Sequence, residues 1–259
     1  LGIDSVVNFS KDLGIYENPN ELLSISLGST ETTLLKLTSA YSAFVNGGKL
    51  VEPILIDRIQ DSEGETIFNN DGRKCINCDQ ISYLGSDYPK IKDNYKRVFS
   101  PQTAYQMTSI LEGVVQRGTG KKLRDLNLNL AGKTGTTNDN KDAWFIGYSP
   151  DLVIGVYVGH DIPKSLGYKQ TGSSVAVPIF KDFAQMININ SNSVPFRIPS
   201  GISFVKINPN TGLASNSNNS ILEPYIIGTE PFNKRVNVID SLASINNNSI
   251  SGTGSLLDN

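Results

Sequence analysis

Apolar positions recur at helical spacing in several stretches of the chain. The expected helices span residues 4–14, 30–46, 100–118 and 174–187. Ser100 and Pro101 favour a helix start, as the N-cap and the first helical residue. Gly47-Gly48 is typical of a helix end. We expect the apolar stripes of these helices to face a core rather than a binding surface.

Strand patterns fall between and after these helices. The expected strands span residues 54–59, 66–68, 126–136, 143–148, 152–158 and 204–207, and the polar stretch 69–99 reads as a long surface loop. The turn 61–64 predicts a hairpin between the first two strands. Strands in runs with helices on both sides in sequence predict an α+β fold, a mainly antiparallel sheet flanked by helices.

A change in composition divides the chain. Residues 1–190 carry the helices and most strands, and residues 191–240 predict a strand-and-turn extension. Residues 241–259 are rich in Ser and Asn. That last segment has too little apolar area to offset its chain entropy, so we expect a disordered tail.

Charge and composition narrow the class of protein. With 23 Lys+Arg against 25 Asp+Glu, the formal charge is -2, and no basic surplus indicates nucleic-acid binding. No apolar run approaches the ~20 residues that span a bilayer. His160 is the only histidine, which disfavours a His-based zinc site and a Ser-His-Asp triad. We expect no metal and no cofactor. The start at Leu1 suggests a piece of a longer protein.

Cys75 and Cys78 form a single CxxC pair in polar surroundings. A structural zinc site usually needs two such pairs, and a thioredoxin-like motif needs a βαβ setting. We expect two surface-loop cysteines, which a non-cytoplasmic environment would allow to form a disulfide.

Lys133 admits two interpretations. Gly132-Lys133-Thr134 would end a phosphate-binding loop, which requires G-x-x-x-x-G-K-[ST]. Position 127 should then be glycine but is Asn127. The preceding residues alternate like a strand, and no helix pattern begins at the lysine. These three departures exclude the nucleotide-binding interpretation.

The alternative interpretation is a carboxylate-binding strand of a serine acyltransferase. Lys133 offers a cation, and Thr134 and Thr136 offer hydroxyls, so together they can hold a substrate carboxylate by charge-assisted hydrogen bonds. Gly135 lets a substrate backbone approach the strand closely. The N–H of Thr136 can point at a developing oxyanion. A KTG triplet alone is weak evidence, since a surface turn would read the same way.

Longer stretches strengthen the second interpretation. They are LTSAYSAFVNGGKLVEPILIDRIQDSEG (37–64), SPQTAYQMTSILEGVVQRGTGKKL (100–123), LAGKTGTTNDNKDAWFIGYSPDLVIGVYVGHD (130–161) and AVPIFKDF (176–183). In this order they resemble the transpeptidase domain of class A penicillin-binding proteins, the bifunctional peptidoglycan synthases. The resemblance runs from the first residues to about Pro231 and implies a β-lactamase/transpeptidase-like fold.

The resemblance also implies a chemistry. In that family an SxxK serine attacks a D-alanyl-D-alanine carbonyl, SxN helps to move the proton, and KTG binds the terminal carboxylate. Here the KTG residues Lys133, Thr134 and Gly135, with Thr136 beside them, match. Ser203-Phe-Val-Lys206 formally fits SxxK but follows KTG and reads as a strand. Ser217-Asn-Asn219 and Ser244-Ile-Asn246 formally fit SxN but lie in Asn/Ser-rich text.

We therefore expect residues 1–190 to be the C-terminal part of a transpeptidase domain, with the nucleophile, SxN and a membrane anchor upstream. Thr137 and the loop from Asn138 to Asp142 are expected to border the groove, with Thr137 and Asn138 as its named site residues, and Trp144 is expected to lie in the sheet core. The implied partners are peptidoglycan stem peptides, β-lactams and the N-terminal half of the same domain. The implied location is the periplasmic face of the cytoplasmic membrane, and the isolated chain is expected to be inactive. A non-catalytic binding module and a β-lactamase-like hydrolase remain as alternatives.

Overall fold

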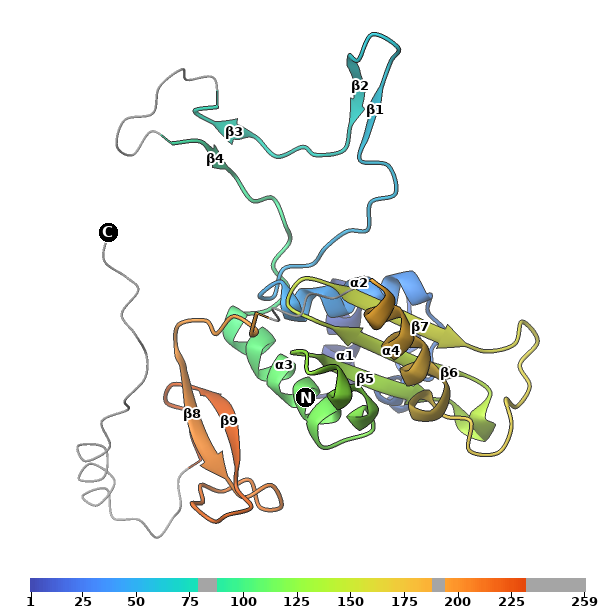
Figure 1. Ribbon diagram of the computed structural model, residues 1–259, viewed down its shortest axis with the longest axis vertical. Coiled ribbons are helices and arrows are strands. Elements are labelled where there is room, and N and C mark those ends of the chain that lie inside the picture. The colour runs from blue at the N-terminus through green and yellow to red at the C-terminus, as the bar shows by residue number, and fades with distance from the viewer. Residues whose placement is uncertain (79–87, 188–193, 232–259) are drawn as a thin grey trace. The chain divides into compact units, whose positions relative to one another are not determined.

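The computed structural model describes residues 1–78, 88–187 and 194–231 (Figure 1). It divides into two compact units, residues 1–200 and 201–259. The expected tail, residues 241–259, lies outside the described residues. The expected division at 190/191 and 240/241 stays a prediction.

Four predicted helices are present in the described part of the first unit: α1 (Ile3–Asp12), α2 (Leu34–Val45), α3 (Pro101–Gln116) and α4 (Val177–Met186). α2 begins later than the predicted Thr30, because the Thr33 hydroxyl accepts a hydrogen bond from Lys36 N at 3.2 Å and caps the helix. The Ser100 hydroxyl caps α3 through Thr103 N at 3.1 Å. The start predicted for α4 at Ser174 is instead a π-helical turn, η4 (Gly172–Ala176), which Thr171 caps.

The predicted strand from Leu126 to Thr136 is wrong over its first half. Residues Lys121–Leu126 form a 3-10 helix, η2, and Asn127 follows with a left-handed φ of 51°. The strand begins only at Ala131. Leu126 and Leu128 instead pack against a buried cluster from non-strand backbone. The alternation of Leu126 and Leu128 therefore reflects how this connection between α3 and β5 packs on the core, and it does not mark a pleated strand.

A three-stranded antiparallel sheet forms the centre of the first unit. Its strands are β5 (Ala131–Thr136), β6 (Ala143–Tyr148) and β7 (Val153–Val158), in the order β5-β6-β7. β6 and β7 confirm the predicted strands. The register pairs Lys133 with Ile146 and Thr136 with Ala143. β5 is an edge strand of this sheet.

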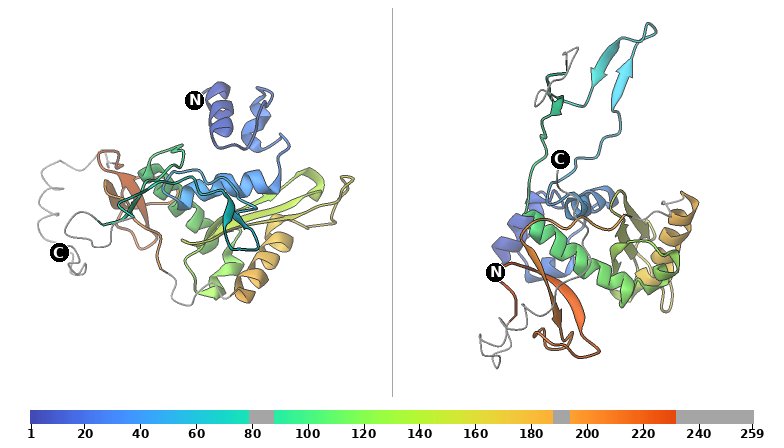
Figure 2. Two further views of the ribbon diagram at one scale, coloured as in Figure 1. Left: turned by 90° about the horizontal axis from the view of Figure 1, so that it is seen from above. Right: turned by 60° about the vertical axis from the view of Figure 1, so that its left-hand side comes forward.

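Helices cover both faces of this sheet (Figure 2). A side chain added at Gly155 of β7 would collide with Leu34 and Thr38 of α2, whereas one added at Gly147 of β6 would collide with Phe180 of α4. Gly155 pairs with Ile146, the neighbour of Gly147, so the two glycines face opposite sides. Glycine at these positions therefore lets the helices lie close to the sheet.

Two buried clusters hold these layers together. The α4-side cluster comprises Val115, Leu123, Leu130, Phe145, Val156, Ala176, Val177, Phe180 and Ala184. Within it, the rings of Phe145 and Phe180 meet edge-to-face at 5.0 Å. The α2-side cluster comprises Leu111, Ala131, Tyr148 and Phe196, with Tyr41, Phe44, Val45, Tyr105, Val114 and Val153 packed against it. The apolar stripes of the helices thus supply core, as predicted.

The segment between α2 and α3 contains two small hairpins. They are β1 (Arg58–Gln60) with β2 (Thr66–Asn69), and β3 (Cys75–Ile76) with β4 (Lys90–Ile91). We call the described residues 52–78 and 88–97 the arm, and every one of them except Asn77 is exposed. The first hairpin was predicted, but its first strand starts at Arg58 instead of Ile54. Cys75 and Cys78 form a disulfide.

The second unit is built on one hairpin in its described part. β8 (Ile202–Ile207) pairs with β9 (Ile221–Ile226) in antiparallel register, from Ile202 opposite Ile226 to Ile207 opposite Ile221. The strand predicted at residues 204–207 is confirmed. Its partner β9 was not predicted.

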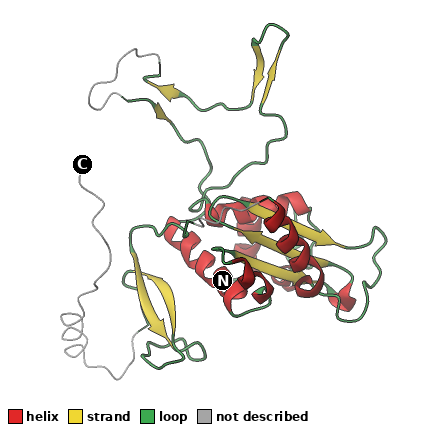
Figure 3. Cartoon of the chain, viewed as in Figure 1, coloured by secondary structure: helices red, strands yellow, loops and turns green. Residues whose placement is uncertain are grey.

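The chain is a mixed α+β protein, in agreement with the predicted class (Figure 3). The single sheet expected from the sequence is present only as β5-β6-β7. The other described strands form separate two-stranded sheets.

Candidate functional site

β5 carries the predicted carboxylate-binding residues on the edge of the central sheet. Because neighbours in a strand face opposite sides, Lys133 and Gly135 share the α2 side, and Thr134 and Thr136 share the α4 side. The structure thus places the four residues on one edge strand, but the Lys133 ammonium lies on the opposite face of the sheet from the two threonine hydroxyls. All four residues can therefore reach one ligand only if that ligand lies along the free edge of β5.

Lys133 has an exposed side chain that returns to its own strand. Its Nζ donates a hydrogen bond to the Thr134 carbonyl oxygen at 2.8 Å. A neutral carbonyl is a weaker acceptor for an ammonium than a carboxylate. The side chain therefore lies beside the edge of β5 in an arrangement that an incoming carboxylate would improve.

The two threonine hydroxyls of β5 are tied to neighbouring elements. Thr134 Oγ1 lies 2.8 Å from Thr119 Oγ1, in the turn after α3. Thr136 Oγ1 accepts a hydrogen bond from Gly172 N at 3.1 Å, at the start of η4. Ser173 of the same turn donates to the Thr119 carbonyl oxygen at 2.6 Å. Two loops distant in sequence thus brace the back of β5.

Gly135 lies opposite Trp144 in the ladder, and a side chain added at Gly135 would approach Trp144 Cβ to 3.1 Å. The Trp144 ring lies 4.6 Å from that of Tyr157 on β7. Trp144 was expected in the sheet core, but it is half-buried and belongs to none of the described buried clusters. It shares the α2 side with Lys133, at the end of the sheet where Tyr157 is 41% exposed.

The loop after β5 returns to β6 through a closed set of hydrogen bonds. Thr137 N donates to the Asp142 carbonyl oxygen at 3.1 Å, and Asp142 N donates to Thr137 Oγ1 at 2.8 Å. The Asp142 carboxylate accepts from the hydroxyls of Thr137, at 3.0 Å, and Tyr157, at 2.8 Å. The bond to Asp142 raises the pKa of the Tyr157 phenol above its ordinary value.

Asn138 begins a short 3-10 turn, η3 (Asn138–Asn140), beside Thr137 and is exposed. Asp139 and Asn140 have positive φ values of 61° and 53°. The crown of this loop is held by the connection between β7 and η4, since Ser165 Oγ donates to Asp139 O at 2.7 Å and Leu166 N donates to Asn140 O at 2.8 Å.

The formal SxxK match lies in a strand, as predicted. Ser203 and Lys206 are both in β8. Residues three apart in a strand point to opposite faces, so the lysine cannot take a proton from that serine directly. The Ser203 hydroxyl donates to Glu230 Oε1 at 2.5 Å, and this bond lowers the pKa of Glu230. Ser217 lies in an exposed turn, and Ser244 lies outside the described residues.

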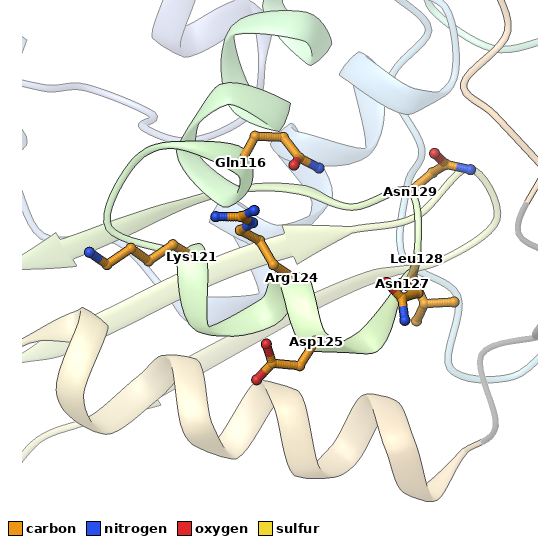
Figure 4. Close-up of a pocket in the computed structure, with 7 residues that line it drawn as sticks. All are labelled: Gln116, Lys121, Arg124, Asp125, Asn127, Leu128 and Asn129. Carbon is orange, nitrogen blue, oxygen red and sulfur yellow. The ribbon is translucent and has the colours of Figure 1, made fainter.

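A polar cavity of about 570 Å³ has no residue of β5 in its lining (Figure 4). It is lined by Gln116, Lys121, Arg124, Asp125, Asn127, Leu128 and Asn129. Asp125 turns toward α4, where its carboxylate pairs with Lys181 at 3.0 Å. The cavity contains none of the predicted site residues.

Two negative observations apply to the described residues. No group of three or more His, Cys, Asp or Glu side chains there is placed to hold a metal ion. No helix there combines the length and apolar character needed to cross a membrane.

Sequence reasoning missed the groups that brace β5. Thr119, Tyr157 and Gly172 approach the strand only in the folded chain. Asp142 belongs to the loop that was expected to border the groove, but its hydrogen bonds to Thr137 and Tyr157 were not predicted. The contacts of Thr119 and Gly172 depend on the path of two long connections and left no local signal.

Comparison with known proteins identifies the family. A model of the penicillin binding protein transpeptidase domain matches residues 7–185. Penicillin-binding protein 1A of Rickettsia typhi is 43% identical over 214 residues, 82% of this chain and 27% of that protein. Its counterpart in Rickettsia felis is 37% identical over 244 residues, 93% of this chain and 31% of that protein.

A crystal structure of penicillin-binding protein 1A from Haemophilus influenzae superposes with a TM-score of 0.74 at 29% identity, covering 91% of this chain and 38% of that chain. The chain thus spans 27 to 31% of the length of these two Rickettsia relatives. Because the family model matches residues 7–185, most of its length, this chain belongs to the penicillin-binding protein transpeptidase family.

Proposed function

We propose that this chain is the carboxylate-binding part of a serine D,D-transpeptidase that cross-links peptidoglycan stem peptides. The observation that carries the proposal is Lys133 on the edge strand β5, with an exposed ammonium whose one hydrogen-bond partner in the described part of the chain is the Thr134 carbonyl oxygen. Family membership supplies the reaction class, and the edge strand supplies a place where an extended peptide can lie.

In the proposed reaction, Lys133 exchanges the Thr134 carbonyl oxygen for the terminal carboxylate of a D-Ala-D-Ala stem peptide. A serine then attacks the penultimate carbonyl, and the C–N bond to the terminal D-alanine breaks as that amine takes a proton. The amine of a neighbouring stem peptide next attacks the acyl-serine ester and releases the serine. The Thr136 N–H would stabilise the oxyanion formed in both attacks.

The nucleophile in this proposal comes from outside residues 1–259. Ser203 is the formal candidate in the chain, and its strand setting separates it from Lys206. β-Lactams would acylate the same external serine, and the reaction would take place at the periplasmic face of the cytoplasmic membrane. Thr137 and Asn138 would border the groove beyond the end of β5.

A second candidate is a non-catalytic binding module of the same fold. The observation that favours it is the lack of a usable serine–lysine pair among the described residues. The two candidates are separated by the DNA upstream of Leu1. An open reading frame encoding SxxK and SxN supports the enzyme, and a stop codon or frameshift supports the binding module.

Labelling with a fluorescent penicillin tests the enzyme directly. We expect the complete protein to be labelled and residues 1–259 alone to remain unlabelled. Lys133→Ala should slow labelling of the complete protein about ten- to hundredfold, because a charge-assisted hydrogen bond contributes roughly 1.5–3 kcal/mol. Lys122→Ala, an exposed lysine of η2, removes the same charge elsewhere and should leave the rate unchanged.

Two results would overturn the proposal. One is stoichiometric labelling of the isolated chain at Ser203. The other is equal labelling rates for Lys133→Ala and Lys122→Ala.

A further inference from the structure

The end of β5 is not held by the sheet ladder alone. The last β5–β6 pair is Thr136 with Ala143, and the hydrogen bond from Thr137 N to Asp142 O continues the ladder by one rung. This rung lies at an exposed end of the sheet, where terminal pairs fray first. Any substrate interaction of Thr136 therefore depends on what holds this extra rung closed.

Side chains supply that closure. The Asp142 carboxylate accepts one hydrogen bond from the Thr137 hydroxyl at 3.0 Å and another from the Tyr157 hydroxyl at 2.8 Å. The Thr137 hydroxyl in turn accepts from Asp142 N at 2.8 Å. One carboxylate thus joins the residue after β5, the residue before β6 and a residue of β7.

The residues around this contact leave space for it to form. A side chain added at Gly159 would lie 2.8 Å from Asp142 Oδ1 and would overlap the Tyr157 hydroxyl. Glycine at this position therefore leaves the room in which Tyr157 reaches Asp142. The Tyr157 ring is itself packed against Trp144, which fixes the direction of its hydroxyl.

We propose that Asp142 is a positioning residue, which uses the Thr137 and Tyr157 hydroxyls to hold the end of β5 in the conformation that binds substrate. Asp142 touches no substrate in this proposal and acts only through Thr137 and Thr136. The catalytic consequence rests on the function proposed above, but the structural part does not.

The first experiment measures amide hydrogen exchange in the chain itself. Asp142→Asn should raise the exchange rate of the Thr137 amide about tenfold, because the loss of a hydrogen bond to a charged acceptor is worth roughly 1.5 kcal/mol. Asp151→Asn makes the same change in the turn at the other end of β6, where the exposed carboxylate has no role in the rung, and should leave that rate unchanged.

Two further variants weaken the hydrogen bond between Tyr157 and Asp142 without changing Asp142 itself. Tyr157→Phe removes only the hydroxyl, and Gly159→Ala alters none of the three interacting side chains yet displaces the hydroxyl. Both should accelerate exchange at Thr137. The double variant Asp142→Asn/Tyr157→Phe should add little to Asp142→Asn alone, because both changes remove one interaction.

The second experiment measures penicillin acylation of the complete protein. Asp142→Asn should slow acylation about tenfold when the rate is measured far below the unfolding midpoint of the variant. Nearly all of the protein is folded there, so a general loss of stability would not slow the reaction. If Thr137 exchange is unchanged in Asp142→Asn and Gly159→Ala, the positioning role is overturned whatever the acylation result. If exchange rises but acylation is unaffected, the rung exists and its link to substrate binding is wrong.

If the wild-type complete protein is not acylated, the proposed function fails, and the exchange data still decide whether Asp142 holds the rung.

Discussion

The central sheet and the arm are both built from antiparallel hairpins, yet they differ in almost every other respect. In the sheet, β6 lies between two strands and two helical layers, and its Phe145 and Tyr148 are fully buried. In the arm, Phe68 is 44% exposed and Leu55 is 98% exposed. Local sequence in both regions is rich in β-branched and aromatic residues, so strand propensity does not explain the difference.

The difference lies in what each hairpin packs against. An isolated two-stranded hairpin is at best marginally stable in water, whereas a hairpin covered by helices buries one face or both. The arm hairpins bury little within the described chain, and the disulfide between Cys75 and Cys78 supplies a covalent link beside the shortest strand pair. Among the described residues of the first unit, the six-residue strands are therefore those that helices cover, and the uncovered strands have two to four residues.

The largest expected effect comes from truncating the sheet core. Phe145→Ala should lower the free energy of unfolding by about 3–5 kcal/mol, because it removes an aromatic ring from a packed cluster and leaves a cavity. Denaturant unfolding of the chain measures this loss. A cost below about 1 kcal/mol would show that the cluster around Phe145 is not a tightly packed core.

The buried hydroxyl of Tyr148 allows a second test of the sheet, in which the free energy of unfolding is measured for a Tyr148 variant and as a function of pH. Its hydroxyl donates to Thr108 Oγ1 at 3.2 Å, and burial raises the pKa of its phenol above the ordinary value near 10. Tyr148→Phe should cost about 1–2 kcal/mol at neutral pH, because Thr108 loses a buried partner.

The sign of the pH dependence follows from the raised pKa. Above about pH 10 the unfolded chain releases the phenol proton while the native state retains it, so stability falls as pH rises through this range. The wild-type chain should lose up to roughly 1.4 kcal/mol per pH unit more than Tyr148→Phe. Denaturant unfolding at pH 8, 10 and 11 measures the difference in the free energy of unfolding between the wild-type chain and Tyr148→Phe. A difference that stays constant with pH would contradict the raised pKa of Tyr148.

The smallest effect is expected in the arm. Phe68→Ala makes the same side-chain change as Phe145→Ala, but at an exposed position opposite Ile59. It should change the free energy of unfolding by less than about 0.5 kcal/mol, as surface substitutions usually do. If Phe68→Ala costs as much as Phe145→Ala, the arm packs into a core and the comparison fails.

Sequence patterns predicted the sheet better than its surroundings, for a physical reason. β6 and β7 were placed correctly because turn residues separate two runs rich in β-branched and aromatic side chains. The strand predicted from Leu126 and Leu128 was wrong, because alternation over a few residues also arises when irregular backbone packs on a core. The strand predicted from Ile54 was too long for a different reason: residues 54–56 are apolar but have no partner strand, so they form no ladder.

The candidate site shows the same limit. Lys133 to Thr136 could be proposed as a site from the sequence because a carboxylate-binding strand needs a cation, hydroxyls and a glycine close together in the chain. Their division between the two faces of β5 follows from strand alternation and could have been stated in advance. The contacts from Thr119, Tyr157 and Gly172 could not, because they depend on how separate connections fold against the strand.

Trp144 is the only tryptophan in the chain, and its place opposite Gly135 gives it a practical consequence. Its indole emission reports on one defined spot, beside the strand that carries Lys133. Excitation of Tyr157, whose ring lies 4.6 Å away, would be transferred to it efficiently. The protein thus contains its own optical probe, and the proposed binding of a ligand along β5 can be tested by fluorescence without an added label.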